Sequence, residues 1–407
     1  MQLKHRASIG VLASVLAATM LAACGAPGGN APATSAGGGD VPATPSAPVT
    51  LNILDIAGDL QLTQSMIDQY AAQNPNIVAS VNYTTGTAPD MPGKVKAQQD
   101  ANNVQIDMIL TGTDGLASGI SQGLYLPIAT AFADRLPNMA NYLAPAAAMQ
   151  TLAQGQGVVV TYYPSGPLLE YNPATVTNPP TTPAELLAWA QAHPGKFGYA
   201  NPANSGPART FLMGLPYLLG DSDPRDPVNG WTKTWDFLKQ LDQYIDYYPA
   251  GTSATMTNIA NGTWDMIATT TGWDINPRAL GTVPANYQIS AYQNFTWVTD
   301  AHYVVIPKGV SADKQSAIIS LVNYMLQPEV NAMAFDSGYF YPGPAVQGAT
   351  LSMAPQKDQD VINQFGRPEY DNLIANNPTA LPLDSASMVK AYDLWNQNIG
   401  QNGSKVK

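Results

Sequence analysis

Polar side chains and a glycine follow two of the expected strands, at places where a small molecule could bind. Asp55 and Gly58 come after the first strand, and Thr113 and Asp114 come after a later buried one. Ligand sites in open α/β sheets lie beyond the carboxyl ends of strands, and glycine lets the backbone approach a ligand closely. We therefore expect these four residues to bind a small molecule, and a plain loop is the alternative for Thr113 and Asp114. The first two equally fit an ordinary turn in which Asp59 caps the next helix.

A second polar loop, residues 201–210, runs into an apolar helix. It contains Asn204, Ser205, Gly206 and Arg209. The first N–H groups of a helix have no partner within the helix, so they could hold a carboxylate, a phosphate or a hydroxyl group. We expect these four residues to contribute to a binding site. For Arg209, a solvated position in the first helical turn is an equal alternative.

An aromatic residue beside a carboxylate, Trp273 followed by Asp274, lies in a loop next to a glycine. The face of a Trp ring packs on a sugar ring or attracts a cation, and the neighbouring carboxylate adds charge or hydrogen bonds. A Trp in the hydrophobic core is the alternative. Tyr341 is a further candidate for the site, and the sequence leaves open whether it lines a cleft together with Tyr339 and His302.

The sequence offers little for metal, cofactor or covalent chemistry. Three histidines and one cysteine cannot form a zinc site of familiar spacing. Residues 221–226 begin like a calcium loop, but they lack its glycine and its final glutamate. Dinucleotide- and phosphate-binding glycine motifs are missing as well. We expect no catalytic residue, no cofactor and no metal; the alternative is a surface glycosidase with Asp55 and Asp274 as paired carboxylates.

Alternating strand and helix patterns predict an α/β architecture. Residues 49–56 alternate apolar and polar side chains as a strand does, and residues 77–83 predict a second strand. Apolar residues three and four positions apart predict helices, with start signals at Thr182–Glu185 and at Ser311. A short buried strand is expected at 106–110, and helices are expected at 62–74, 94–101, 182–189, 231–245 and 311–325.

Composition argues against nucleic acid as a partner. The chain has 407 residues, with 18 Lys and Arg against 29 Asp and Glu, and a formal net charge of −11. Phosphate binding needs clustered basic side chains, and the sequence contains no such cluster. After the first fifty residues, roughly 350 remain, which is enough for two domains.

The first fifty residues predict export and a membrane anchor. A basic start and a short apolar run make residues 1–23 a signal peptide, too short to span a membrane. Its end, Leu21-Ala22-Ala23-Cys24, resembles a bacterial lipobox, which implies that Cys24 is lipidated; a chance Cys is the alternative. Residues 24–48, nearly all Gly, Ala, Pro, Ser and Thr, predict a flexible tether. We expect a lipoprotein on the outer face of the cytoplasmic membrane, at the cell surface or in the periplasm.

Five sequence blocks, taken in order, resemble the extracellular solute-binding proteins of bacterial ABC importers, the family 1 group that includes maltose-type binders. The most specific block is Leu169-Glu170-Tyr171-Asn172 with Asn178-Pro179-Pro180-Thr181-Thr182-Pro183-Ala184-Glu185-Leu186-Leu187. The other blocks cover residues 51–83, 106–128, 261–273, and 303–309 with 337–344. Within the family, the part from Trp273 to Tyr341 resembles a YnjB-like branch.

The resemblance implies the type II periplasmic-binding-protein fold, in which two α/β lobes enclose a ligand cleft. By analogy, lobe one comprises residues 49–158 and 294–340, and lobe two comprises residues 159–293 and 341–407. The protein would then be no enzyme. It would be a monomer that captures a small extracellular solute by lobe closure and delivers it to the transmembrane permease of an ABC importer.

Several solutes fit the sequence. A carbohydrate comes first, because the family often carries one and aromatic and neutral polar groups suit it. An organic cation such as a polyamine or thiamine comes second, favoured by the acidic balance. An anionic solute at the helix start beside Ser205 comes third. An adhesin or assembly lipoprotein is a further alternative from another class of protein.

Overall fold

The computed structural model describes residues 41–407. The expected signal peptide, Cys24 and the tether up to residue 40 therefore lie outside the described residues. Residues 41–48, the end of the expected tether, contact the body of the protein. The Arg135 guanidinium donates to the carbonyl of Ala43 at 3.2 Å, and the Ser46 amide donates to the Asp313 carboxylate at 3.1 Å.

The larger sheet has the strand order β10-β4-β9-β3-β1-β2, with β11 beside β9. Strands β2, β1 and β3 are parallel, whereas β9 is antiparallel to both β3 and β4. Apolar residues at alternate positions of β1, such as Leu51 and Ile53, are buried in the core as the period of two requires. The strands are β1 (Val49–Asp55), β2 (Val78–Thr85), β3 (Met108–Thr111), β4 (Gly157–Gly166), β9 (Trp297–Val305), β10 (Gly343–Pro344) and β11 (Thr379–Ala380).

The smaller sheet has the order β6-β7-β5-β8. Its central strands are short and almost entirely buried, and β5 is antiparallel to both of its neighbours. A sheet buried in this way needs helices on its faces. The strands are β5 (Leu168–Tyr171), β6 (Phe197–Gly198), β7 (Met266–Thr269) and β8 (Gln288–Ala291).

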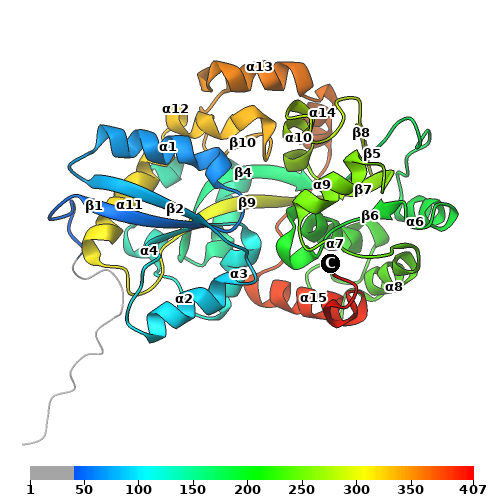
Figure 1. Cartoon of the computed structure of the whole chain (residues 1–407), viewed down its shortest axis with the longest axis horizontal. Helices are drawn as coiled ribbons and strands as arrows, with labels where there is room; N and C mark the ends of the chain where they lie inside the picture. Colours follow the sequence, from blue (N-terminus) through cyan, green and yellow to red (C-terminus); the bar gives the residue numbers. More distant parts are fainter. Residues whose placement is uncertain (1–40) are drawn as a thin grey trace, which may run out of the picture. The chain divides into compact units, whose positions relative to one another are not determined.

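Helices surround both sheets, as Figure 1 shows. Among residues 41–407, no helix is both long and apolar enough to cross a bilayer. Those that pack with the larger sheet include α1 (Leu60–Gln73), α2 (Met91–Asp100), α3 (Thr113–Ser121), α4 (Ile128–Ala131), α5 (Ala144–Gln150), α11 (Ala312–Met325) and α12 (Pro328–Asn331). The others are α6 (Pro183–Ala192), α7 (Gly206–Leu219), α8 (Thr232–Leu241), α9 (Thr252–Ala260), α10 (Ile275–Ala279), α13 (Gln356–Phe365), α14 (Pro368–Asn376) and α15 (Ser385–Asn398).

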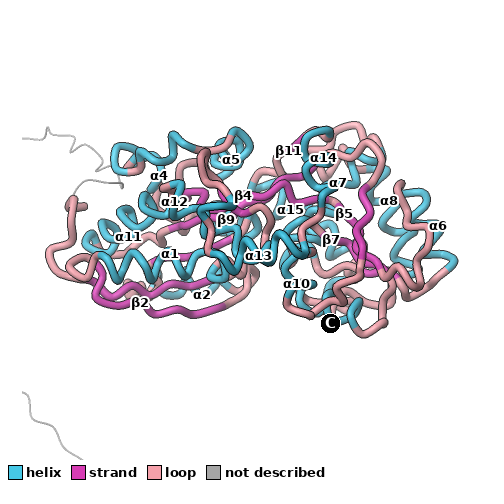
Figure 2. The backbone as a smooth tube through the Cα atoms, turned by 90° about the horizontal axis from the view of Figure 1, so that it is seen from above, coloured by secondary structure: helices cyan, strands magenta, loops and turns pink. Residues whose placement is uncertain are grey.

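Two long paired strands, β4 and β9, connect two hydrophobic cores. The first core takes its residues from the chain up to Tyr162 and from 301–346, and the second takes most of its residues from 168–298 and 370–399. In Figure 2, β4 and β9 run between the elements of the two sheets. The chain therefore forms two α/β lobes with a shared pair of strands. Ala345 and Val346 pack in the first core.

Of the two helix N-caps predicted from the sequence, one forms the expected hydrogen bond and the other does not. At α6, the Glu185 amide donates to the Thr182 hydroxyl at 3.2 Å, which confirms the predicted capping. At α11, Ser311 occupies the N-cap position but its side chain caps no amide of the described chain, so that prediction was wrong in its mechanism. Helix α8 ends at Leu241, and the remainder of the expected helix forms a 3₁₀ turn.

One buried carboxylate makes stability depend on pH. Burial, and then the charge of Asp358, raise the pKa of Asp336 to about 6. Because this folded-state pKa exceeds the unfolded value, the stabilisation that protonated Asp336 gives the folded protein is complete below about pH 4. It is lost as the pH rises through 6. Asp336→Asn should therefore raise the free energy of unfolding at pH 8 by up to about 3 kcal/mol and change it little at pH 4. Urea titrations at both pH values measure this difference.

Asp360→Asn is the matched control, because Asp360 is an exposed carboxylate on the neighbouring α13. Its substitution should leave the difference between pH 4 and pH 8 unchanged. An Asp336→Asn variant with the pH dependence of the wild type would show that Asp336 is ionised throughout this range.

Candidate functional site

A cavity of about 470 Å³ lies where both lobes meet, and it is the candidate binding site. Ile56, Ala57 and Gly58 follow β1, and Gly112 and Asp114 follow β3. Strands β2 and β3 lie on opposite sides of β1, and the carboxyl ends of strands at such a reversal form a crevice in α/β sheets. The larger sheet thus places the loops of lobe one at the cavity.

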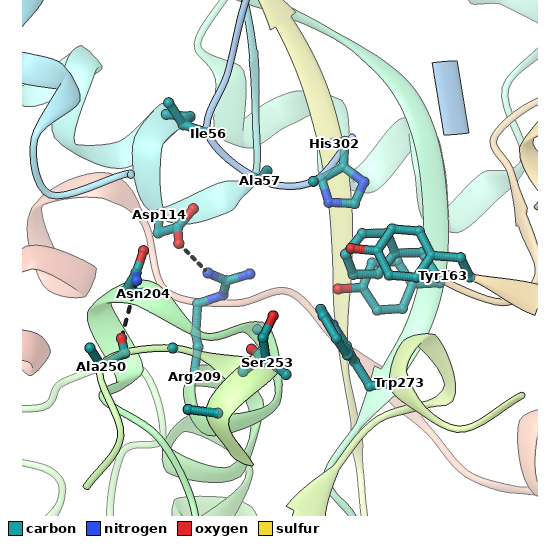
Figure 3. A pocket seen from close by; sticks show the side chains of 18 of the residues that line it. Ile56, Ala57, Asp114, Tyr163, Asn204, Arg209, Ala250, Ser253, Trp273 and His302 are labelled. Atoms are coloured by element: carbon teal, nitrogen blue, oxygen red, sulfur yellow. Dashed lines mark hydrogen bonds and ion pairs between the residues drawn. The ribbon is translucent and has the colours of Figure 1, made fainter. Parts of the chain in front are cut away.

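Lobe two supplies the opposite wall from helix starts and one aromatic loop. It contributes Asn204, Gly206 and Arg209 around the start of α7, residues 250–254 at the start of α9, and Trp273. Four residues near the crossing of the chain between the lobes complete the lining: Tyr163 on β4, His302 on β9, and Tyr339 and Phe340. Figure 3 shows Arg209 reaching towards Asp114, with Trp273 and Tyr163 to one side.

Six of the eleven residues expected from the sequence line this cavity, and five do not. The lining residues are Gly58, Asp114, Asn204, Gly206, Arg209 and Trp273. The residues that do not line it are Asp55, Thr113, Ser205, Asp274 and Tyr341. Each of these five has partners within the protein that account for its position.

Asp55 and Ser205 support helix starts behind the cavity wall. The Asp55 carboxylate accepts from the amides of Ala57 and Asp59, at 2.9 and 3.1 Å, and from the Leu60 amide at 3.1 Å. It therefore caps α1, a role that the sequence had suggested for Asp59. The Ser205 hydroxyl accepts from the Ala208 amide at the start of α7.

Asp274 and Tyr341 belong to the interior of lobe two. The Asp274 carboxylate is fully buried and forms ion pairs with Arg278 at 2.9 Å and Arg367 at 2.7 Å. The Tyr370 hydroxyl donates to it at 2.7 Å, and Tyr341 stacks beside Tyr370. Both candidates thus face other protein groups, because the chain turns away from the cavity directly after Trp273 and Phe340.

Arg209 is the centre of a buried ion-pair network that joins the lobes. Its Nη1 lies 2.9 Å from Asp114 Oδ2, and its Nη2 donates to Asp300. Asp300 on β9 also accepts from the hydroxyls of Thr113 and of Tyr163, the latter at 2.9 Å. Burial alone would raise the pKa of Asp300, but the charge of Arg209 and the hydrogen bond from Thr113 outweigh it and lower the pKa. Arg209 is therefore a fixed, charged group.

Aromatic rings form one side of the cavity. Trp273 meets Tyr339 and Phe340 nearly edge to face, with ring centroids 5.5 and 6.2 Å apart. The His302 ring packs on Phe340 at 4.3 Å, and burial lowers its pKa to about 4, so His302 is neutral at physiological pH. Gly58 is required beside them, because it has a φ of +76° and a Cβ would lie 2.6 Å from the Tyr339 hydroxyl.

A second buried carboxylate lies behind this wall. Asp59 is fully buried, its two oxygens accept no hydrogen bond from the described residues, and its Oδ1 lies 3.6 Å from His302 Nδ1. Burial, and then the nearby charge of Asp55, raise the pKa of Asp59 well above its usual value. The neutral form of Asp59 is thus favoured behind the cavity wall.

Sequence reasoning missed two parts of the lining. The segment 250–254 has a recognisable signal, since Gly251 precedes Thr252 and Ser253 at the start of an apolar-patterned helix. Tyr163 and Lys407 carry no comparable signal, because only the pairing of β4 with β9 and of residues 405–407 with 248–250 brings them to the cavity. Tyr339 and His302, which the sequence left open, both line it.

Two α/β lobes that share crossing strands and enclose a solute-sized cavity define a two-lobe periplasmic binding protein. The cavity lining includes the carboxylate of Asp114, but residues 41–407 contain no cluster of three groups placed to hold a metal ion. The chain belongs to the bacterial extracellular solute-binding protein family, whose model matches residues 65–363. This confirms the family expected from the sequence, whereas the YnjB-like branch stays a prediction.

Solved structures share this fold. One is a putative spermidine/putrescine ABC transporter from Listeria monocytogenes, with 15% identity and a TM-score of 0.60 over 87% of this chain and 99% of that chain. Another is AfuA from Actinobacillus pleuropneumoniae with bound fructose-6-phosphate, with 15% identity and a TM-score of 0.60 over 86% and 98%. The Atu4243-GABA receptor has 17% identity and a TM-score of 0.59 over 87% and 96%. No curated protein sequence matches the chain.

The family consists of solute-binding proteins and not of enzymes. The glycosidase alternative from the sequence is therefore set aside. The structure gives the physical reason: neither Asp55 nor Asp274 lines the cavity, because the first caps α1 and the second is buried among arginines.

Proposed function

We propose that this protein is the substrate-binding protein of an ABC importer, which captures a small extracellular solute and delivers it to a membrane permease. The observation that carries the proposal is a cavity that is lined from both lobes and bridged by the ion pair between Asp114 and Arg209. A solute that contacts both walls stabilises the closed arrangement by its differential contacts. Strands β4 and β9 serve as the hinge, because they carry the chain between the two cores.

The solute classes expected from the sequence are supported by different parts of the cavity. Trp273, Tyr339 and Phe340 offer ring faces and edges to a carbohydrate. Asp114 and the same rings suit an organic cation such as a polyamine or thiamine. The similar structures differ in the same way, because one is named as a spermidine/putrescine transporter and another contains fructose-6-phosphate.

The location of the protein is also a proposal. A lipid on Cys24 would hold the protein at the outer face of the membrane, in line with the extracellular family. Residues 41–48 contact Arg135 and Asp313, both in the part of the chain that carries the first core. The tether would thus attach to lobe one, and lobe two would move on binding. We propose that the protein acts as a monomer.

Thermal unfolding of the mature chain, with Cys24→Ser to prevent lipidation, tests the proposal. The panel contains mono- and oligosaccharides, sugar phosphates, polyamines, thiamine, amino acids and small organic acids. A solute at about 100 times its dissociation constant adds about 2.7 kcal/mol of stability. Small-angle scattering with the same solute should show a smaller radius of gyration on closure. A solute that stabilises without closure, or a panel without any effect, would contradict the proposal.

Trp273→Ala should weaken binding of the solute found in this way by about tenfold to a thousandfold. Removal of one large aromatic anchor from a binding site costs about 1–4 kcal/mol. Trp273 is only half-buried, so the variant should remain folded. Titration calorimetry measures the affinity, and Trp235→Phe on α8, away from the cavity, is the control. An affinity equal to that of the wild type would show that Trp273 packs against its neighbours and does not touch the solute.

A further inference from the structure

The helix starts of lobe one are neutralised by carboxylates. Asp55 accepts three amides at the start of α1, and Asp114 lies in the first turn of α3, where it accepts from the Gly115 amide at 2.8 Å. A helix N-terminus carries about half a positive charge, so a full carboxylate more than cancels it. Asp300 lies on the same side and is matched by Arg209. Lobe one therefore presents a negative wall to the cavity.

The helix starts of lobe two have no such carboxylate. Helix α7 is capped by the neutral hydroxyl of Ser205. Helix α9 follows Gly251, which has no side chain, and its first residues Thr252, Ser253 and Ala254 line the cavity. The first amides of a helix have no acceptor within the helix; at α7 this leaves the Gly206 amide, because Pro207 has no N–H and the Ala208 amide donates to Ser205. Two positive helix ends thus face the cavity from lobe two.

A buried guanidinium on the same wall has donors to spare. Arg209 is only 5% exposed and lines the cavity. Its Nη2 donates to Asp300, whereas its Nη1 forms no hydrogen bond with the described residues. Nη1 lies 2.9 Å from Asp114 Oδ2, but outside hydrogen-bonding geometry. An acceptor from a ligand could take the N–H groups of Nη1 that the protein leaves without a partner.

From this opposition of charge we propose that the solute is zwitterionic, with an anionic group bound by Arg209 and the starts of α7 and α9, and a cationic group bound by Asp114. The inference rests on the proposed function and names the solute class of the same cavity. The cationic group also lies within the aromatic side formed by Trp273 and Tyr339. The ligand anion joins Arg209 from the side of lobe two, and Asp114 exchanges part of its contact with Arg209 for the ligand cation.

Solutes with one kind of charge fit this cavity less well. A polyamine would meet Arg209 and two helix ends with the same sign, and a dicarboxylate would meet Asp114 with the same sign. A neutral sugar would offer no charged group to Asp114 or to Nη1 of Arg209. Only a molecule with both charges offers an opposite charge to each wall, and this makes the two ends of the solute distinguishable in binding experiments.

The experiment compares molecules that share a skeleton and differ in charge. We would titrate the mature chain by calorimetry with unbranched ω-amino acids from glycine to 6-aminohexanoate and with lysine and glycine betaine. For each amino acid, the matched acid without the amine and the matched amine without the acid serve as controls, together with putrescine, glucose 6-phosphate and maltose. We expect at least one zwitterion to bind ten times more tightly than both of its controls.

Other outcomes separate this inference from the proposed function. Tightest binding of putrescine, of maltose or of an acid without an amine would overturn the zwitterion and leave the solute receptor intact. A panel in which nothing binds would count against both. Equal affinity of a zwitterion and its amine control would show that the helix starts of lobe two take no part.

Two variants test the walls with the best zwitterion of the panel. Ser253→Asp places a carboxylate at the start of α9, where it suits the helix and should preserve folding, yet it should weaken binding at least tenfold. Thr257→Asp adds the same charge one turn further along α9, at an exposed residue outside the cavity lining, and should leave binding near that of the wild type. Similar affinities for the two variants would overturn the proposal.

Discussion

Replacement of Arg209 by Met should abolish solute binding and lower the free energy of unfolding by about 3–5 kcal/mol. Arg209 is buried between Asp114 and Asp300, whose side chains are 12% and 3% exposed. Met keeps much of the volume but removes the charge, so the buried Asp300 loses its cationic partner. The pKa of Asp300 should then rise, because burial is the largest influence on it and the opposing influence of Arg209 is gone.

Urea unfolding followed by Trp fluorescence measures the stability of this variant, and calorimetry measures binding. The double variant Arg209→Met with Asp300→Asn is the control, because it removes both members of the buried pair. It should recover part of the lost stability, since it leaves only Asp114, the more exposed of the two carboxylates, without a cationic partner, but it should not recover binding. If the double variant is less stable than Arg209→Met, Asp300 stabilises the fold through the hydrogen bonds that it accepts from Thr113 and Tyr163 and not through its pairing with Arg209.

The strands and helices could be predicted from the sequence where one periodic pattern dominates. Residues 49–56 alternate apolar and polar side chains, and β1 occupies Val49–Asp55. The expected helix at 62–74 is α1, Leu60–Gln73. The pairing of β4 with β9 could not be predicted in this way, because both strands are buried along their whole length and lack any alternation. The connection between the lobes depends on this long-range pairing.

The candidate site was predictable only where it lies next to a recognisable turn. Gly58, Asp114 and Gly206 follow strands or precede helices, and such positions reach the cavity by the geometry of the fold. A carboxylate in a loop, by contrast, gives no sign of its partner. The Asp55 carboxylate accepts hydrogen bonds from amides nearby in sequence. The Asp274 carboxylate accepts them from Arg367, which lies 93 residues further along the chain. Sequence patterns cannot show which of these groups are already satisfied.

The ion-pair cluster around Asp274 holds the C-terminal helices on lobe two. Asp274 precedes α10, Arg278 lies within α10, and Arg367 and Tyr370 lie at the start of α14. Arg367 donates to Asp274 at 2.7 and 2.9 Å and to the carbonyl of Tyr287 at 2.8 Å. Glu170 on β5 is also fully buried, and neither of its oxygens accepts a hydrogen bond from the described residues.

These two buried carboxylates differ in charge. Burial, and then the charge of Asp274, raise the pKa of Glu170 well above its usual value, which favours its neutral form. Burial acts on Asp274 in the same direction, but the hydrogen bonds and charges of Arg367 and Arg278 outweigh it and lower the pKa. The charged form is therefore favoured at Asp274, beside two guanidinium groups, and the neutral form is favoured at Glu170.

Asp274→Asn should lower the free energy of unfolding at pH 7 by about 3–5 kcal/mol, because two buried arginines lose their anionic partner. Glu170→Gln, the matched control, should change it by less than about 1 kcal/mol, because it replaces a group that is already neutral. In the Asp274→Asn variant, Asp274 no longer raises the pKa of Glu170, whereas both arginines still lower it, so this pKa should fall. A raised pKa of Glu170 makes the wild type lose stability as the pH rises, so the variant should lose less, and its deficit relative to the wild type should narrow from pH 5 to pH 8 in urea titrations. Solute affinity of the folded protein should match the wild type, since Asp274 does not line the cavity. Equal destabilisation by the two substitutions would show instead that Glu170 is ionised and shares the arginines with Asp274.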